Sequence, residues 1–307
     1  MNILIIGGTG FIGTHLVDAL ASLNHNIYVF GRHKSKYENT NVKYIYGDFN
    51  DITSLNQILK DIDIVYHLLS STVPATANLN PKFDIESNLV NTVNFLEKLE
   101  FLNIKKIIYI SSGGTVYGNS KFQPINENHP LNPSGSYGIV KVAIENYIKY
   151  FSCKFKIPFL IIRPSNPYGP RQNYKGKQGV ISSFLYNSIS KKDLNIWGDG
   201  SNIRDYIYIS DLVNFIIKSS FSKKTGIFNV GFGNGSSVID ILNEVKQVTQ
   251  SNPFINFIKT KNMDIDKVVL DISKAIKTFN WKPKISLSEG IKLHHDWLRS
   301  ELNINNK

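Results

Sequence analysis

Two alternating patterns of hydrophobic and polar positions run through the first half of the 307-residue chain. Short and almost wholly apolar runs predict buried strands, whereas stretches with apolar residues three or four positions apart predict helices. Apolar strands that alternate with helices indicate a parallel sheet covered on both faces. The strand-like runs occupy 2–7, 26–31, 42–48, 63–69, 105–112 and 158–164, and the helical stretches occupy 11–23, 81–101 and 136–155.

The pattern changes at about residue 172. The later strand-like runs, at 194–198, 204–209 and 226–231, are short and separated by loops. We therefore predict an α/β fold, with a doubly wound parallel sheet in residues 1–171 and a smaller C-terminal α/β lobe in residues 172–307. Some segments of the second half are expected to return to the first domain.

The first strand-like run leads into the sequence GGTGFIG, whose glycines are Gly7, Gly10 and Gly13. Gly7 allows a tight turn after the strand, and Gly10 lets backbone amides approach a pyrophosphate. Gly13 lies inside the following helix, whose N-terminus favours negative charge. A strand, this loop and a helix in that order predict a Rossmann-type dinucleotide site. A plain strand-to-helix turn is the alternative.

The end of the second strand bears on which dinucleotide is bound. NAD-binding folds usually place an acidic residue there to bind the ribose hydroxyls, but this chain has Gly31 followed by Arg32. Arg32, with His33 or Lys34, is suited to the additional phosphate of NADP, although all three also suit an ordinary basic loop. Asp48, at the end of the third strand, is a candidate acceptor for the adenine amine.

A candidate catalytic pair lies on the helix predicted from residue 136. Tyr137 and Lys141 are four residues apart and therefore share a helix face. An ammonium beside a phenol stabilises the phenolate, so the pair predicts a Tyr137 pKa lowered from about 10 towards neutrality. Such a tyrosine can exchange a proton with a sugar hydroxyl while a hydride moves to or from nicotinamide.

Several further motifs occur in a fixed order along nearly the whole chain. They are GGTGFIG at 7–13, SSGGTVYG at 111–118, the Tyr137 and Lys141 pair, RPSNPYGPRQ at 163–172, RDYIYI at 204–209 and LDISKAIKTFNWKP at 270–283. On these motifs the chain resembles the extended short-chain dehydrogenase/reductase, or NAD-dependent epimerase/dehydratase, family. The resemblance is strongest to its branch of UDP-galactose 4-epimerase-like nucleotide-sugar enzymes, and implies that the second lobe binds the nucleotide sugar.

The resemblance implies roles for individual residues. It makes Tyr137 the acid/base, and Lys141 the group that tunes the Tyr137 pKa and binds the nicotinamide ribose. It assigns the substrate diphosphate to Arg204, whose guanidinium fork suits phosphate oxygens, and a substrate contact to Asn166. Further cofactor contacts are implied at Phe11, Ile12, Leu68, Asn88 and Pro164.

Two positions depart from the family pattern. Gly113 stands where the family's catalytic Ser or Thr lies, four residues before the tyrosine of VYG. The hydroxyl must then come from Ser112 or Thr115; we assign Ser112 to catalysis and Thr115 to substrate binding. Lys261 stands where the family usually has an arginine, three residues before Asp264. Both are expected to bind substrate. A lysine keeps the positive charge of an arginine but cannot form its bidentate hydrogen bonds to phosphate.

The motifs favour one reaction over its neighbours in the family. Dehydratases place acids beside the catalytic Thr, and SSGGTVYG contains none. We expect a 4-epimerase of a UDP- or dTDP-hexose that uses bound NAD, with NADP open because of Arg32, in the synthesis of cell-surface polysaccharide precursors. An NADPH-dependent 4-keto-6-deoxysugar nucleotide reductase is the first alternative, and a non-enzymatic dinucleotide sensor is the second.

The amino-acid composition limits which cellular compartment and which binding partners are expected. The net charge is +11, but the lysines are scattered among Asn and Ile, so we expect an anionic small substrate and no nucleic acid. No apolar run approaches the roughly 18 residues of a membrane span, and the single cysteine, Cys153, fits a reducing compartment. We expect a cytoplasmic protein without a metal site. The resemblance also implies a homodimer that pairs the helices at 81–101 and from 136.

Overall fold

The computed structural model describes residues 1–176, 178–259 and 265–304. The chain forms two compact units. The first contains Met1–Gly118, Pro130–Arg163 and Val213–Phe228, and the second contains Asn119–His129, Pro164–Leu212 and Asn229–Lys307. The chain therefore passes from one unit to the other several times. The boundary expected between residues 171 and 172 stays a prediction.

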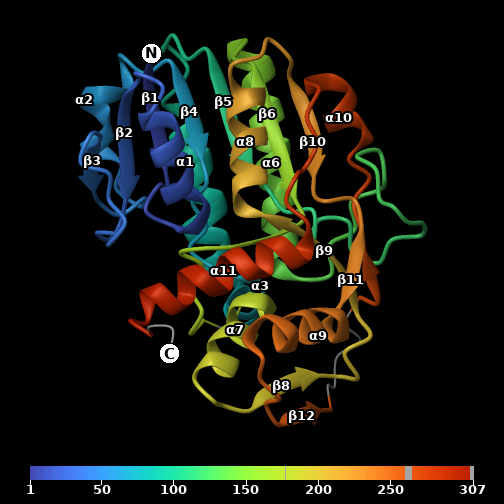
Figure 1. The fold of residues 1–307 in the computed structure, drawn as a ribbon. Coiled ribbons are helices and arrows are strands. Elements are labelled where there is room, and N and C mark those ends of the chain that lie inside the picture. The colour runs from blue at the N-terminus through green and yellow to red at the C-terminus, as the bar shows by residue number, and fades with distance from the viewer. Residues whose placement is uncertain (177, 260–264, 305–307) are drawn as a thin grey trace. The chain divides into compact units, whose positions relative to one another are not determined.

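A seven-stranded sheet forms the centre of the first unit (Figure 1). Its strands are β1 (Asn2–Ile6), β2 (Asn26–Gly31), β3 (Lys43–Tyr46), β4 (Ile64–His67), β5 (Lys106–Ile110), β6 (Phe159–Pro164) and β10 (Gly226–Val230). Their order is β10-β6-β5-β4-β1-β2-β3, and neighbouring strands from β3 through β6 run parallel. The chain builds outward from β1 to β3 and then returns to β4 beside β1. The predicted doubly wound parallel sheet is confirmed, and its strand order reverses between β1 and β4, where such folds bind ligands.

Helices cover both faces of this sheet. They are α1 (Phe11–Ala21), η1 (Thr53–Leu55), α2 (Asn56–Leu59), α3 (Pro74–Leu79), α4 (Pro81–Asp84), η2 (Ile85–Val90), α5 (Asn91–Glu97), α6 (Ser136–Phe155) and α8 (Ile209–Ser220). Leu4 and Ile6 of β1 are buried in one cluster with Phe95 of α5 and Ile144 of α6. The alternate residues of β1 point to the opposite face, where α1 lies (Figure 1). Because both faces are covered, the central strands consist mostly of apolar residues.

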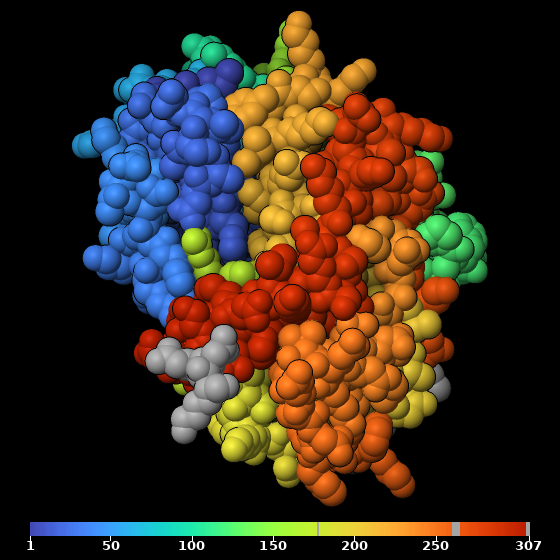
Figure 2. All heavy atoms as spheres, viewed as in Figure 1, coloured from blue at the N-terminus to red at the C-terminus, as the bar shows by residue number. Residues whose placement is uncertain are grey.

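The second unit is built around β9. Its elements are β7 (Asn166–Tyr168), α7 (Val180–Ile189), β8 (Leu194–Trp197), β9 (Ile203–Tyr208), β11 (Gly235–Ser237), α9 (Val238–Thr249), β12 (Ile255–Ile258), β13 (Lys267–Val268), α10 (Ser273–Phe279) and α11 (Leu287–Glu301). β9 pairs with β7 and β13 in parallel and with β11 antiparallel. A separate parallel pair joins β8 to β12. Helices α9 and α11 lie side by side at the surface (Figure 2).

Two elements differ from the sequence pattern. The single helix expected at 81–101 is divided into α4, the π-helical turn η2 and α5, and it ends at Glu97. The wider turn includes Ser87 and Asn88, which are buried polar residues, so side-chain hydrogen bonding accompanies the change of helix type. The strand at 226–230, which we grouped with the C-terminal lobe, pairs with β6 as the edge of the first sheet.

Among the helices of the described ranges, none combines the length and the apolar character of a membrane span. In the same ranges, His, Cys, Asp and Glu side chains do not gather in groups of three or more that would suit a metal ion. Cys153, on α6, is an exposed free cysteine.

Candidate active site

The glycine loop joins β1 to α1 through close backbone contacts. Gly7 has a φ of +81°, and a Cβ there would lie 2.7 Å from the amide nitrogen of Leu69. A Cβ on Gly13 would lie 2.5 Å from the carbonyl oxygen of Gly7, so the loop packs tightly on the first turn of the helix. A Cβ on Gly10 would meet only that same carbonyl, at 3.4 Å. The backbone at Gly10 is therefore open on its other side.

The start of α1 is suited to an anion. Gly10 is its N-terminal capping residue in extended conformation, and no side chain caps the helix. Phe11, Ile12 and Gly13 form the first turn, where amides have no partner within the helix. Such amides bind phosphate groups, and the helix dipole favours the negative charge. The three residues thus fit the pyrophosphate of a dinucleotide.

Tyr137 and Lys141 share one face of α6, as their spacing predicted, but the pair is arranged differently from expectation. The Nζ atom of Lys141 lies 5.6 Å from the centre of the Tyr137 ring and donates to the carbonyl of Ile110 at 3.0 Å. The Tyr109 ring lies under the same ammonium at 4.9 Å. The ammonium therefore faces two aromatic rings and the end of β5.

Burial controls the acid–base properties of this pair. It raises the pKa of Tyr137 to about 12, a hydrogen bond with Ser70 lowers that pKa, and the charge of Asp84 raises it further. Burial also lowers the pKa of Lys141 to about 8, although the charges of Glu145 and Asp84 raise it. The lowered Tyr137 pKa that we expected is thus not found, because desolvation outweighs the neighbouring ammonium.

The segment after β5 carries the two candidate hydroxyls. Ser112 is partly buried directly after the strand, and Gly113, at the family's Ser/Thr position, is buried. The hydroxyl of Thr115 is buried and has no hydrogen-bond partner among the described residues. A Cβ on Gly138 would lie 2.7 Å from the carbonyl oxygen of Thr115, so this segment lies against the first turn of α6, next to Tyr137.

A buried ion pair between Glu145 and Arg163 is hydrogen-bonded to the same segment. The guanidinium of Arg163, at the end of β6, donates to both carboxylate oxygens of Glu145 on α6, at 2.9 and 2.5 Å. Ser111 also donates to Glu145, at 2.5 Å, and Arg163 donates to the Tyr117 hydroxyl at 2.9 Å. Glu145 lies one helical turn after Lys141. This pair was not predicted from the sequence, because Glu145 and Arg163 are 18 residues apart and lie on different elements.

Asn88 has an internal role in the structure. Its side-chain oxygen accepts from the amide of Ser71 at 2.8 Å, and its side-chain nitrogen donates to Thr72 and to Asp84, at 3.1 and 2.9 Å. The side chain thereby holds the loop after β4, which also contains Ser70. Asp84, four residues before Asn88, is fully buried and was likewise not predicted from the sequence as a site residue.

The other candidate cofactor residues lie at the ends of the parallel strands. Arg32 is exposed after β2, and Asp48 is exposed after β3, where its carboxylate accepts from the amide of Asn50 at 2.9 Å. Leu68 follows β4 and donates its amide to Ile6 at 2.9 Å. Pro164 is the buried last residue of β6. A Cβ on Gly31 would lie 2.6 Å from the hydroxyl of Thr9, so a larger residue there would require the Thr9 side chain to move.

Two candidate substrate residues share a face in the second unit. Asn166 on β7 is paired in register with Tyr206 on β9, and Arg204 lies two residues before Tyr206 on the same strand. Residues in register, and residues two apart, point to one side of a sheet. Asn166 also donates to the carbonyl of Asp205 at 2.8 Å. The structure thus brings Asn166 and Arg204 together, whereas Lys261 and Asp264 lie outside the described residues.

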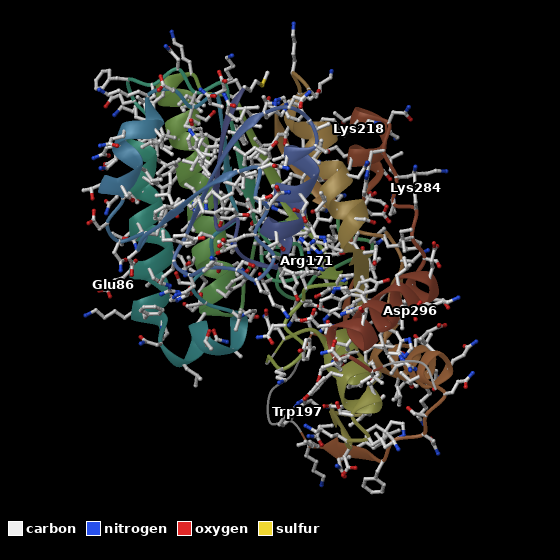
Figure 3. All side chains as sticks on the ribbon, turned by 60° about the vertical axis from the view of Figure 1, so that its left-hand side comes forward. Glu86, Arg171, Trp197, Lys218, Lys284 and Asp296 are labelled. Carbon is white, nitrogen blue, oxygen red and sulfur yellow. The ribbon has the colours of Figure 1, made fainter. Side chains whose placement is uncertain are left out.

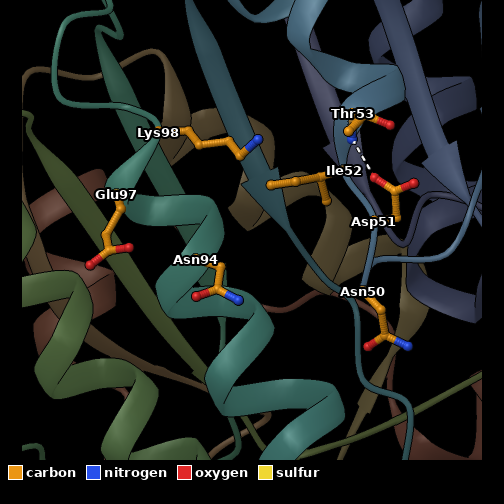
Figure 4. Close-up of a pocket in the computed structure, with 7 residues that line it drawn as sticks. All are labelled: Asn50, Asp51, Ile52, Thr53, Asn94, Glu97 and Lys98. Atoms are coloured by element: carbon orange, nitrogen blue, oxygen red, sulfur yellow. Dashed lines mark hydrogen bonds between the residues drawn. The ribbon is translucent and has the colours of Figure 1, made fainter.

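A surface hollow of about 480 Å³ opens elsewhere in the first unit (Figure 4). Residues of the loop after β3 and of α5 line it, and the amide of Thr53 donates to Asp51 at 3.0 Å within it. None of the candidate residues above lies in its wall. The lining residues are Asn50, Asp51, Ile52, Thr53, Asn94, Glu97 and Lys98.

Several known proteins are similar to this chain in sequence and in structure. A UDP-glucose 4-epimerase-like protein of Methanocaldococcus jannaschii is 33% identical over 302 residues, which are 97% of this chain and 98% of that protein. The dTDP-4-dehydro-6-deoxyglucose reductase of Escherichia coli is 32% identical over 94% of this chain and 95% of its own length. The crystal structure of Thermotoga maritima UDP-glucose 4-epimerase with UDP-glucose superimposes with a TM-score of 0.95 at 31% identity, covering 98% of this chain and 100% of that chain.

The family model described as the NAD dependent epimerase/dehydratase family matches residues 3–231. This range includes the glycine loop, the Tyr137 and Lys141 pair and Arg204. With a match over most of its length and relatives above 30% identity that span nearly all of it, the chain belongs to the NAD dependent epimerase/dehydratase family.

Proposed function

We propose that the protein is a nucleotide-sugar 4-epimerase that acts on a UDP-hexose with NAD as its cofactor. The observation that carries the proposal is the match to a UDP-glucose 4-epimerase structure, with a TM-score of 0.95 over 98% of the chain. The Tyr137 and Lys141 pair, together with the glycine loop, supplies the chemistry that such a reaction requires. Production of precursors for cell-surface polysaccharides is the proposed role.

The first unit fits a dinucleotide. Amides of Phe11, Ile12 and Gly13 at the uncapped start of α1 would hold the pyrophosphate. The open side of Gly10 gives the backbone room to approach it. NAD, when bound, supplies the acceptor and donor of the hydride. The protein itself supplies only positioning and proton transfer.

Tyr137 is the proposed proton carrier. With a pKa of about 12, its Oη atom is protonated at neutral pH, which suits proton donation to a sugar C4 oxygen during re-reduction. In the oxidation half of the reaction the same oxygen acts as a phenolate, whose negative charge the Lys141 ammonium stabilises, and it becomes a neutral phenol when it takes the C4 hydroxyl proton. Ser112 is proposed to bind the same sugar hydroxyl. Thr115 is proposed to contact the sugar, because its buried hydroxyl lacks a protein partner in the described part of the chain.

Residues of the second unit are proposed to bind the substrate. Arg204 is proposed to bind the diphosphate through its guanidinium, and Asn166, on the same face of the β7–β9 pair, to contact the nucleotide sugar. Lys261 and Asp264 are proposed to add contacts to the same substrate.

A panel of UDP-, dTDP- and GDP-sugars, assayed with and without NAD(P)H, tests the proposed reaction. Interconversion of a UDP-hexose and its C4 epimer without net consumption of cofactor supports it. The reductase alternative has one specific observation in its favour, which is the 32% identity to the Escherichia coli reductase. Stoichiometric oxidation of NADPH with a 4-keto sugar nucleotide, and no epimer formation, would establish the reductase instead.

Arg32 makes NADP the proposed second cofactor. Its side chain is exposed after β2, next to Gly31 at the position where NAD-binding folds usually carry an acid. Calorimetric titration of the purified protein with NAD and with NADP measures the preference. Equal affinity for the two would support a guanidinium contact to the additional phosphate, whereas strong preference for NAD would leave Arg32 as a basic loop residue.

We also propose a homodimer through α6. Ile139, Tyr147 and Tyr150 are 55%, 41% and 57% exposed on this helix, and their spacing places them along one face. Val90, on the neighbouring turn η2, is 44% exposed. A second copy of the chain would cover this apolar stripe. Sedimentation equilibrium distinguishes a dimer from the monomer that would contradict the proposal.

A further inference from the structure

Asp84 carries a buried carboxylate that joins three segments of the first unit. It ends α4 and is fully buried. Its Oδ1 atom accepts from the hydroxyl of Thr72 at 2.5 Å and from the side-chain nitrogen of Asn88 at 2.9 Å. Its Oδ2 atom accepts from the hydroxyl of Ser136 at 2.7 Å. One carboxylate thus binds the loop after β4, the turn η2 and the start of α6.

Two of these segments hold Tyr137. Ser136 directly precedes it in the first turn of α6, and Thr72 lies in the same loop as Ser70, whose side chain is hydrogen-bonded to Tyr137. The Ser70 hydroxyl donates to the carbonyl of Thr72 at 2.9 Å, so the two loop residues are coupled. A displacement of the Asp84 carboxylate would therefore move both the helix turn and the loop that hold the phenol.

The energetics of Asp84 also need an explanation. Its three side-chain partners are neutral, and no ion pair within the described ranges involves it. A buried carboxylate without a cation is costly, so it is retained only where its charge is compensated or used. The Lys141 ammonium is the buried cation whose electrostatics Asp84 affects.

We propose that Asp84 is a positioning residue for Tyr137 and Lys141. Its hydrogen bonds fix the two segments on either side of the phenol, and its negative charge stabilises the ammonium in a site that water does not reach. The inference rests on the proposed function only in taking Tyr137 as the proton carrier.

The other titratable groups near the pair either are neutral or have a cationic partner of their own. Glu145, on α6, also raises the pKa of Lys141, and more than Asp84 does, but its carboxylate is bound by Arg163 from β6 in a bidentate contact. His67, on β4, is neutral near pH 7 because burial lowers its pKa to about 3. Tyr109, on β5, is neutral because burial raises its pKa well above 10. Asp84 is therefore the negative charge near the pair that no cation neutralises by direct contact in the described part of the chain.

Asp84→Asn tests the charge while keeping the size of the side chain. The charge of Asp84 raises the pKa of both Tyr137 and Lys141, so its removal should lower both. One limb of the kcat–pH profile reflects the titration of Tyr137 and Lys141. We expect the midpoint of this limb to move toward lower pH by about one pH unit or more. We also expect kcat at neutral pH to fall by about tenfold or more, as for loss of a positioned proton carrier, while the KM for the sugar nucleotide changes little.

Glu86→Gln is the matched control. Glu86 lies two residues after Asp84, and its exposed side chain extends away from the helices toward solvent (Figure 3). Its carboxylate forms an exposed ion pair with Lys82, at 3.8 Å. The control should leave both the limb of the profile and kcat unchanged. An equal effect of the two variants would overturn the proposal.

A spectroscopic titration separates this inference from the proposed reaction. Carbon-13 NMR of labelled tyrosine follows the Tyr137 phenol, whose signal is assigned by its loss in Tyr137→Phe. The signal should titrate at lower pH in Asp84→Asn than in the native protein, whatever substrate the enzyme uses. An unmoved titration together with an unmoved pH profile would reduce Asp84 to a structural residue. Inactivity of the native protein on all sugar nucleotides would instead contradict only the proposed function.

Ser136→Ala separates positioning from charge, and it applies even if Asp84→Asn does not fold. It removes one hydrogen bond to the carboxylate and retains the carboxylate itself. We expect a several-fold lower kcat with the midpoint of the limb unchanged. An unaltered kcat would contradict the positioning role.

Discussion

Tyr137 shows how burial changes the meaning of a sequence motif. The four-residue spacing correctly places Lys141 on the same helix face, and it suggested a lowered phenol pKa. In the folded protein the ammonium lies over the ring and binds the end of β5, and burial raises the Tyr137 pKa to about 12. Spacing along a helix fixes which side chains meet, but the sign of the pKa shift depends on desolvation, which no local motif contains.

Replacement of Tyr137 by phenylalanine should remove the proton carrier and leave the packing in place. We expect kcat to fall by about 10²- to 10⁴-fold, the usual contribution of general acid–base catalysis, with the affinity for NAD unchanged. Steady-state kinetics together with calorimetric NAD binding measure the two effects. Tyr147→Phe, on the same helix and 41% exposed, is the control for loss of a phenol. Near-native turnover in Tyr137→Phe would exclude Tyr137 as the proton carrier.

Arg204 is expected to act on substrate binding. Arg204→Ala removes a charge-assisted hydrogen bond worth about 1.5–3 kcal/mol, so the KM for the nucleotide sugar should rise roughly ten- to hundredfold. Cofactor affinity should not change. Lys277→Ala removes one exposed positive charge from α10 in the same unit and serves as the control. An unchanged KM in Arg204→Ala would mean that another residue binds the diphosphate.

At the scale of elements, the sequence is most informative where one pattern governs a whole segment. The helix Ser136–Phe155 and the strand Asn26–Gly31 were predicted with the bounds they have in the structure. The stretch from Pro81 was harder to predict, because the π-helical turn at Ile85–Val90 accompanies buried hydrogen bonds with Thr72 and Ser136, which are distant in sequence. The same reason explains why Asp84 and Glu145 were missed among the site residues.

The Glu145–Arg163 ion pair connects α6 to β6 of the sheet, so its loss should lower the free energy of unfolding. Glu145→Gln leaves the Arg163 guanidinium buried without its counter-charge, and breaking a buried pair in this way costs about 3–5 kcal/mol. Urea unfolding measures the change in the free energy of unfolding. Glu100→Gln breaks the exposed pair with Lys154, whose charged atoms are 3.7 Å apart, and should cost less than about 1 kcal/mol. Similar costs for the two variants would show that the buried pair does not anchor the helix.

At the scale of the whole molecule, each unit contains a buried neutral histidine. His67 lies in the sheet of the first unit, where its Nε2 atom is 2.8 Å from the Thr92 hydroxyl. His294 lies on α11 of the second unit, and its two ring nitrogens have no hydrogen-bond partner among the described residues. Burial lowers the pKa of both to about 3, against an ordinary value near 6.5. Protonation of either ring is therefore coupled to unfolding.

The sign of this coupling predicts loss of stability in mild acid. Below about pH 6.5 the unfolded chain binds a proton at each histidine and the folded chain does not, so the free energy of unfolding falls by up to about 1.4 kcal/mol per pH unit for each ring. Asp205 opposes part of the effect, because burial raises its pKa to about 6 and the folded state then binds a proton first. Between about pH 6 and pH 4 the three groups still leave a net uptake of roughly one proton on unfolding.

Urea unfolding at a series of pH values tests this, with His294→Leu as the informative variant. The native protein should lose stability steadily below about pH 6.5, and the variant should lose it with a smaller slope, because one of the two proton uptakes is gone. His33→Leu, which removes an exposed histidine after β2, should leave the slope unchanged. If His294→Leu and the native protein lose stability in parallel, His294 is not protonated on unfolding in this range, and the acid sensitivity must come from His67 or from the carboxylates.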